Sequence, residues 1–200
     1  MMRIITGTAR GVRLDTLEGD ATRPTSERAK EAVFSMLQFD LIGKRILDLF
    51  SGSGQMALEA LSRGSSSAVM VDQSKDAIRI ITKNAEKTRL ADKCTIVCAD
   101  FKDYLARRRG RDKFDYIFLD PPYAMHAIPA AVEGIVHGQL LADTGLLICE
   151  SGEPDPLGHA TGTALSKKFD VVREAKYGVA YVTVYAPARA DGQESEEADA

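Results

Sequence analysis

The chain has 200 residues, of which 44% are hydrophobic and 28% charged, and its formal net charge is −3. These values predict a globular domain long enough to bury a substantial core. No apolar run approaches the ~20 residues that a membrane-spanning helix needs, and the N-terminus lacks the apolar segment of a signal peptide. We therefore expect a cytoplasmic protein without a membrane partner.

The first forty residues predict a small extension that precedes the main domain. Short apolar stretches at Arg3–Thr6 and Val12–Leu14 bracket a Gly/Arg turn and predict a hairpin. A helix is expected over Ser26–Leu37, with Ser26 or Thr25 as its N-cap. An extension of this length, 1–40, is expected to pack on the main domain and to contact a substrate.

The middle of the chain alternates short apolar runs with helix-length amphipathic segments. Strands are predicted at Arg45–Phe50, Ala68–Asp72, Cys94–Cys98, Tyr116–Asp120 and Leu146–Glu150. Helices are predicted near Gln55–Arg63, Ser74–Arg89 (with Ser74 as N-cap), Phe101–Arg108 and Ala127–Gln139. This alternation is typical of an α/β, Rossmann-like fold, in which a mostly parallel sheet carries helices on both faces.

The C-terminal part predicts an antiparallel end to the sheet and then a tail. The runs Phe169–Ala175 and Val179–Tyr185 flank the turn signal Tyr177-Gly178, which favours a terminal hairpin. The main domain is expected to span residues 41–188. Residues 190–200 hold five acids and no basic residue, so the rest of the chain has a net charge of +2. We expect residues 189–200 to form a disordered acidic tail.

The cysteines and histidines do not form a recognisable metal or disulfide pattern. Cys94, Cys98 and Cys149 are odd in number and lack CxxC spacing, so no metal site is expected. We interpret all three as small buried residues on strands. Cys149 has no adjacent base in the sequence, which disfavours a cysteine nucleophile there.

The first predicted strand of the sheet runs into a glycine-containing loop, Asp48-Leu49-Phe50-Ser51-Gly52-Ser53-Gly54, and then into a helix. Glycines at this position allow close backbone approach to a ligand at the carboxyl ends of the strands. Taken alone, the loop could equally bind the pyrophosphate of a dinucleotide.

Three carboxylates favour S-adenosylmethionine over NAD as the ligand of this loop. Asp48 is placed to reach a cationic amino group, Asp72 to accept bonds from ribose hydroxyls, and Asp100 to accept a bond from an adenine amino group. Each could instead be a helix N-cap or a surface acid. The neighbouring cofactor contacts are predicted to be Phe50, Ser51, Gly52, Gly54, Gln73 and Phe101.

The motif Asp120-Pro121-Pro122-Tyr123 follows an apolar strand and predicts the catalytic loop. An exocyclic amine of a base is a poor nucleophile, and acceptors for its two N–H groups make the nitrogen more electron-rich. Asp120 offers a side-chain oxygen and Pro121 a carbonyl, while two prolines hold the loop rigid. Tyr123 can stack on a base held outside its helix. The alternative interpretation is a rigid turn with a buried tyrosine.

These residues also resemble a known family. The opening RIITGTARGVRL, the segment Arg23-Pro24-Thr25 with Glu31 to Phe34, LDLFSGSG with EALSRG, Asn84, FDYIFLDPPY and YGVAYVTVY are similar to the bacterial 16S rRNA (guanine-N2)-methyltransferases (RsmD-like). The resemblance covers nearly the whole chain apart from the tail. It departs from the family at Ser51 and Asp72, where alanine and glutamate are common.

The resemblance implies a class I S-adenosylmethionine-dependent methyltransferase fold. It implies methylation of a guanine 2-amino group in 16S rRNA, within the assembling small ribosomal subunit, and we expect the enzyme to be monomeric. Arg10, Arg13, Arg23 and Thr25 would then lie near the RNA, although a solvated positive face explains the arginines equally well.

Four other functions stay open at this point. A DNA adenine-N6 methyltransferase would use the same motif chemistry, and a protein glutamine methyltransferase would more comfortably carry Asn than Asp120. A ribosome assembly factor could keep the fold without catalysis, although it would be expected to lose Asp120 or the glycines. A nicotinamide-dependent oxidoreductase would leave the Asp120–Tyr123 motif without a role.

Overall fold

A computed structural model describes residues 2–17, 24–37, 40–108, 110 and 112–188, with residues 24–28 described by their backbone alone. The helices are α1 (Pro24–Met36), α2 (Gln55–Ser62), α3 (Lys75–Lys87), α4 (Phe101–Arg107) and α5 (Ile128–Gly138), with 3-10 turns at Ala91–Lys93, Tyr123–Met125 and Ser166–Lys168. The strands are β1 (Arg45–Asp48), β2 (Ser67–Asp72), β3 (Cys94–Cys98), β4 (Phe114–Leu119), β5 (Leu141–Ser151), β6 (Phe169–Tyr177) and β7 (Ala180–Pro187). The predicted tail lies outside the described residues.

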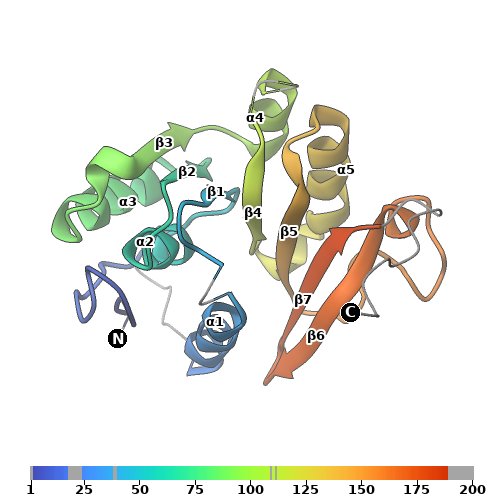
Figure 1. Cartoon of the computed structure of the whole chain (residues 1–200), viewed down its shortest axis with the longest axis horizontal. Helices are drawn as coiled ribbons and strands as arrows, with labels where there is room; N and C mark the ends of the chain where they lie inside the picture. The colour runs from blue at the N-terminus through green and yellow to red at the C-terminus, as the bar shows by residue number, and fades with distance from the viewer. Residues whose placement is uncertain (1, 18–23, 38–39, 109, 111, 189–200) are drawn as a thin grey trace, which may run out of the picture.

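The seven strands form one mixed sheet in the order β3-β2-β1-β4-β5-β7-β6. The first five strands are parallel, and β7 pairs antiparallel with both β5 and β6. The chain crosses from β1 outward to β2 and β3, and later returns to place β4 on the other side of β1 (Figure 1). The carboxyl ends of β1 and β4 therefore flank a topological switch point, where α/β sheets bind ligands.

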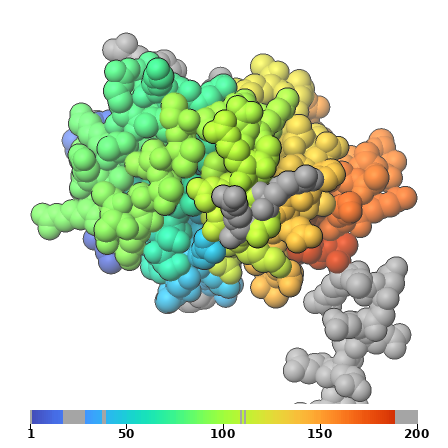
Figure 2. All heavy atoms as spheres, turned by 90° about the horizontal axis from the view of Figure 1, so that it is seen from above, coloured from blue at the N-terminus to red at the C-terminus, as the bar shows by residue number. Residues whose placement is uncertain are grey.

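Two buried clusters cover the two faces of the sheet. One contains apolar residues of α1, α2 and α3, and the other contains those of α4 and α5. Figure 1 shows the two groups of helices on opposite sides of the strands, and in Figure 2, seen from above, the C-terminal strands lie at one edge of the molecule. The prediction of a mostly parallel sheet with helices on both faces and an antiparallel terminal hairpin is confirmed.

The central elements agree with the predicted ranges to within a few residues, and the main difference is that β5 is longer, Leu141–Ser151. Ser74 caps α3 as predicted, because its hydroxyl accepts the Ala77 N–H at 3.3 Å. The terminal turn is Gly178-Val179, since Tyr177 still pairs with Ala180, and Gly178 has the positive φ that a two-residue hairpin turn needs.

The interpretation of all three cysteines as buried is wrong for Cys98, which is exposed, and Cys94 is only partly buried. Both lie on β3, which is an edge strand of the sheet that the described residues form. Cys149 is buried on the interior strand β5, and burial raises the pKa of its thiol well above the usual range. A buried, protonated thiol is a poor nucleophile, in agreement with the sequence interpretation.

The predicted cap of the first helix is also wrong. The helix begins at Pro24, so Thr25 and Ser26 lie inside its first turn rather than before it. Proline suits the first helical position, because the backbone N–H that it lacks would have no acceptor within the helix there.

The N-terminal hairpin is reduced to a single antiparallel bridge between Arg3 and Arg13. Ile4 N donates to the Val12 carbonyl and Leu14 N to the Met2 carbonyl, but beyond Ile4 the first stretch bonds elsewhere. The N–H groups of Ile5 and Thr6 donate to the Glu59 carboxylate at 2.8 and 3.0 Å, instead of to a facing strand. Next to them, Gly7 has a φ of +89°, and a Cβ there would lie 1.8 Å from the Ser62 carbonyl oxygen.

The Glu59 carboxylate is fully buried on α2 and is also paired with two cations. Lys30 Nζ of α1 lies 3.1 Å from its Oε2, and Arg63 Nε lies 2.8 Å from its Oε1. Lys30 also donates to the Arg3 carbonyl at 3.2 Å. One carboxylate thus holds the N-terminal segment, α1 and α2 together.

We predict that Glu59→Gln destabilises the protein by about 3 kcal/mol, because it removes the buried carboxylate that pairs with Lys30 and Arg63. Urea unfolding would measure the change. Glu86→Gln is the control, since Glu86 is exposed on α3. A loss no larger than that of the control would show that the buried carboxylate does not carry this attachment.

Candidate functional site

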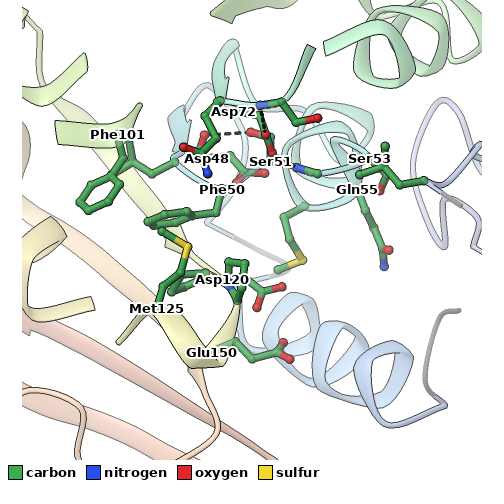
Figure 3. A pocket seen from close by; sticks show the side chains of 18 of the residues that line it. Asp48, Phe50, Ser51, Ser53, Gln55, Asp72, Phe101, Asp120, Met125 and Glu150 are labelled. Atoms are coloured by element: carbon green, nitrogen blue, oxygen red, sulfur yellow. Dashed lines mark hydrogen bonds between the residues drawn. The ribbon is translucent and has the colours of Figure 1, made fainter. Parts of the chain in front are cut away.

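A cavity of about 790 Å³ opens at the carboxyl ends of the parallel strands. Its lining brings together most of the residues that the sequence singled out: Asp48, Phe50, Ser51, Gly52, Asp72, Gln73, Asp100, Phe101, Asp120, Pro121, Pro122 and Tyr123. They come from the ends of β1, β2 and β4 and from the start of α4 (Figure 3). Segments far apart in the sequence therefore meet in one cavity.

The glycine loop is held in shape by backbone contacts. Ser51 N donates to the Val71 carbonyl at 3.0 Å, and the Ser51 hydroxyl donates to the Asp48 carbonyl at 2.9 Å. Gly52 and Gly54 both have positive φ, +53° and +78°. A Cβ at Gly52 would meet nothing within 4 Å, so this backbone borders open space where a ligand can approach.

Gly54 does not line the cavity. Its missing side chain makes room instead for Met70, Ile81 and Leu58, the nearest atoms of which would lie 3.2–3.4 Å from a Cβ. Gly54 thus allows the turn into α2 to pack closely on the core, while Gly52 faces the cavity.

Asp72 fixes the glycine loop to the end of β2. Its Oδ2 accepts the Gly52 N–H at 2.9 Å, and its Oδ1 accepts the Ser74 N–H at 2.8 Å (Figure 3). Each carboxylate oxygen retains a lone pair for a hydroxyl donor in the cavity. Asp72 therefore has both a structural role and the acceptor capacity predicted for it.

Asp100 is the N-cap of α4, where its Oδ1 accepts the Lys102 N–H at 2.8 Å. The capping role that the sequence left open for Asp100 is thus present, on a side chain that also lines the cavity. The rings of Phe50 and Phe101 lie 5.1 Å apart and form an apolar wall beside it. Such a wall next to carboxylate acceptors suits a flat heteroaromatic ring with an amino group.

Asp48 is 3% exposed, and burial raises its pKa to about 7. The backbone N–H groups of Phe50 and Ala57 oppose this rise, and the Asp72 charge adds to it. Ala57 lies in the first turn of α2, so the carboxyl faces the positive end of that helix. A buried carboxyl of this kind can pair with a cationic group that enters the cavity.

The Asp120–Tyr123 motif forms the opposite side of the cavity, directly after β4. Asp120 is exposed, Pro121 is buried, and Tyr123 is 37% exposed. The Tyr123 hydroxyl donates to Glu150 Oε1 at 3.1 Å. The sequence interpretation of Tyr123 as a buried residue of a rigid turn is disfavoured, because its side chain borders the cavity.

The cavity is also lined by residues that the sequence analysis did not place in the site, among them Glu150, Lys30 and Met2. Glu150 stands near the carboxyl end of β5, and burial raises its pKa, although the bond from Tyr123 opposes this. Asp120 was selected because it is an acid at the end of an apolar strand, and the same rule would have selected Glu150. Lys30 and Met2 carry no such signal, because their position depends on how the N-terminal segment folds back.

Two of the predicted RNA contacts, Arg10 and Arg13, lie apart from this cavity. Arg10 and Arg13 are exposed on the N-terminal turn and do not line it. Arg23 and the side chain of Thr25 lie outside the described residues. Phe34 of α1 is fully buried in the core.

Within the described part of the chain, no group of three or more His, Cys, Asp or Glu side chains is arranged to hold a metal ion. None of the helices described is long and apolar enough to cross a bilayer.

Known proteins resemble this chain over most of its length. Residues 2–186 match the family model described as conserved hypothetical protein 95. YlbH of Bacillus subtilis, named as a candidate rRNA methyltransferase, is 32% identical over 185 residues, which cover 92% of this chain and 98% of that protein. Ribosomal RNA small subunit methyltransferase D of Haemophilus influenzae is 29% identical, and the match covers 78% of this chain and 81% of the relative.

A solved structure from Escherichia coli, described as a candidate methyltransferase, yhhF, superimposes with a TM-score of 0.79 at 25% identity. The match covers 93% of this chain and 97% of that one. Together with the sheet order and the cavity, this likeness defines the Rossmann-like fold of class I S-adenosylmethionine-dependent methyltransferases, as predicted. The chain belongs to the family described as conserved hypothetical protein 95, which confirms the resemblance to RsmD-like proteins.

We predict that Asp48→Asn stabilises the protein at pH 8 and raises the free energy of unfolding by about 2 kcal/mol. The amide removes the cost of ionising a buried carboxyl, which is about 1.4 kcal/mol per unit of pKa shift, but it loses some of the hydrogen bonds. Because the folded-state pKa of Asp48 lies above the unfolded value, the wild type loses stability as pH rises from about 4 to about 7.

Thermal unfolding at several pH values would check this. The Asn variant should lose the part of the pH dependence that comes from Asp48. Asp170→Asn on the exposed strand β6 serves as control. Equal pH profiles for wild type and Asp48→Asn would contradict the raised pKa.

Proposed function

We propose that this protein transfers a methyl group from S-adenosylmethionine to the exocyclic 2-amino group of a guanine in 16S rRNA of the small ribosomal subunit. The observation that carries the proposal is the position of Asp120–Tyr123, which faces the glycine loop across one cavity. The names of the B. subtilis and H. influenzae relatives support an rRNA substrate.

The residues fit the proposed cofactor by their chemistry. Gly52 offers open backbone, Asp72 offers acceptors for ribose hydroxyls, and Phe50 with Phe101 offers a wall for the adenine. Asp48 would receive the cationic amino group. When bound, the cofactor supplies an electrophilic methyl carbon on a sulfonium sulfur.

The chain's own residues then prepare the amine. The Asp120 carboxylate and the Pro121 carbonyl accept the two N–H groups, which holds the amine with its lone pair toward the cavity and increases its electron density. The ring of Tyr123 is fixed by its bond to Glu150 and supports the base. The positive turn with Arg10 and Arg13 would contact phosphates, which positions RNA without reading its sequence.

The first test is to supply methyl-labelled S-adenosylmethionine together with unmodified small subunits, naked 16S rRNA or unmethylated DNA. Label in N2-methylguanosine is expected from the subunit or its RNA. Label in N6-methyladenine from DNA would replace the proposal by a DNA adenine methyltransferase. Binding to subunits without any transfer would instead identify a non-catalytic assembly factor.

We predict that Asp120→Ala lowers methyl transfer by roughly 100-fold or more while cofactor binding stays nearly unchanged, because Asp120 acts on the amine. Asp72→Ala should instead weaken cofactor binding, because it removes the carboxylate that accepts the Gly52 N–H and fixes the glycine loop. Calorimetric titration with the cofactor and single-turnover transfer would separate the two. Full turnover by Asp120→Ala would remove this residue from the mechanism.

A further inference from the structure

Glu150 lies beside the catalytic loop in the register of the sheet. Strands β4 and β5 are parallel, and Leu119 of β4 pairs with Cys149 of β5. Asp120 directly follows Leu119, and Glu150 directly follows Cys149. Both acids therefore lie at the same edge of the sheet. Both line the cavity, and Figure 3 shows their carboxyl groups directed to the same side of it.

The Glu150 side chain is fixed and retains acceptor capacity. It is half-buried, and one oxygen accepts the Tyr123 hydroxyl at 3.1 Å. The Tyr123 ring is confined in turn by Gly152, where a Cβ would lie 2.8 Å from the ring. An ionised carboxylate has about four lone-pair positions, and the Tyr123 hydroxyl uses one of them. The other oxygen can receive a donor from the cavity.

Two neighbouring carboxylates require a substrate edge that carries two neighbouring donors. Guanine presents such an edge, because its 2-amino group lies next to the ring N1–H. In adenine and cytosine, the exocyclic amine lies next to an unprotonated ring nitrogen, which would face the carboxylate with its lone pair. Uracil has a ring N–H but no exocyclic amine. Among the four bases, the pair of acceptors at Asp120 and Glu150 matches guanine alone.

We propose that Glu150 is a specificity-determining residue that accepts the N1–H of the target guanine while Asp120 accepts its 2-amino group. The inference rests on the proposed function and deepens it, since it assigns guanine selectivity to a residue outside the Asp120–Tyr123 motif. A site built to accept a hydrogen bond rejects a substrate that lacks the donor, because its own polar group is then left without a partner.

The experiment compares guanine with 2-aminopurine, which keeps the 2-amino group but has an unprotonated N1. The target nucleotide is first mapped with labelled cofactor. Small subunits are then reconstituted with either base at that single position, and kcat and KM for methyl transfer are measured for each. If the wild type forms no N2-methylguanosine on the guanine subunits, the proposed function itself fails, and this inference with it.

For the wild type we expect kcat/KM to be lower for 2-aminopurine than for guanine by roughly 100-fold or more. In Glu150→Gln the amide can donate to the unprotonated N1, so the preference for guanine should shrink to about tenfold or less. The preference is a ratio measured on one preparation, so a partly unfolded sample does not alter it.

Two further variants separate recognition from positioning. Tyr123→Phe should lower both rates and keep the guanine preference, because it removes the bond that orients Glu150 but leaves the Glu150 carboxylate in place. Glu153→Gln, an exposed glutamate outside the cavity lining, should leave rates and preference unchanged. Equal use of the two bases by the wild type, or an unchanged preference in Glu150→Gln, would overturn the inference.

Discussion

The attachment of the N-terminal segment depends on one buried carboxylate. Glu59 is inaccessible to solvent and accepts two backbone N–H groups and the side chains of Lys30 and Arg63. Removing a carboxylate from water is costly, and the four donors offset that cost only if they all converge on it. The positions of the N-terminal segment, of α1 and of α2 are therefore interdependent.

This interdependence reaches the candidate site. Lys30 and Met2, which belong to the elements held by Glu59, also line the cavity between the glycine loop and the catalytic loop. Val179 of the terminal hairpin turn also lines the cavity. The cavity is therefore built from the N-terminal segment and the terminal hairpin as well as from the parallel sheet.

Much of this arrangement could be predicted from the sequence because it follows from local periodicity. Continuous apolar runs predicted the central strands. The rule that functional residues follow the carboxyl ends of parallel strands predicted Asp48, Asp72 and Asp120 as site residues. The roles of these residues as cofactor and substrate contacts stay predictions. Their convergence on one cavity is what the structure adds.

The remaining features depend on contacts between distant segments. The N-terminal stretches look like strands, but Ile5 and Thr6 donate to Glu59, more than fifty residues away. Cys98 lies in an apolar run, yet it is exposed, because β3 is an edge strand of the sheet in the described part of the chain. Glu150 could have been found by applying the strand-end rule to β5 as well.

The side chain of Asn84 on α3 has a consequence for how such proteins can be recombined. Its amide oxygen accepts the Asp15 N–H, and its amide nitrogen donates to the carbonyls of Asp15 and of Ser53 in the glycine loop. Replacing the first forty residues with those of a relative would therefore alter the hydrogen bonds that support the glycine loop, as well as the exposed arginines. The extension is not an interchangeable module, and chimaeras would have to exchange it together with α2 and α3.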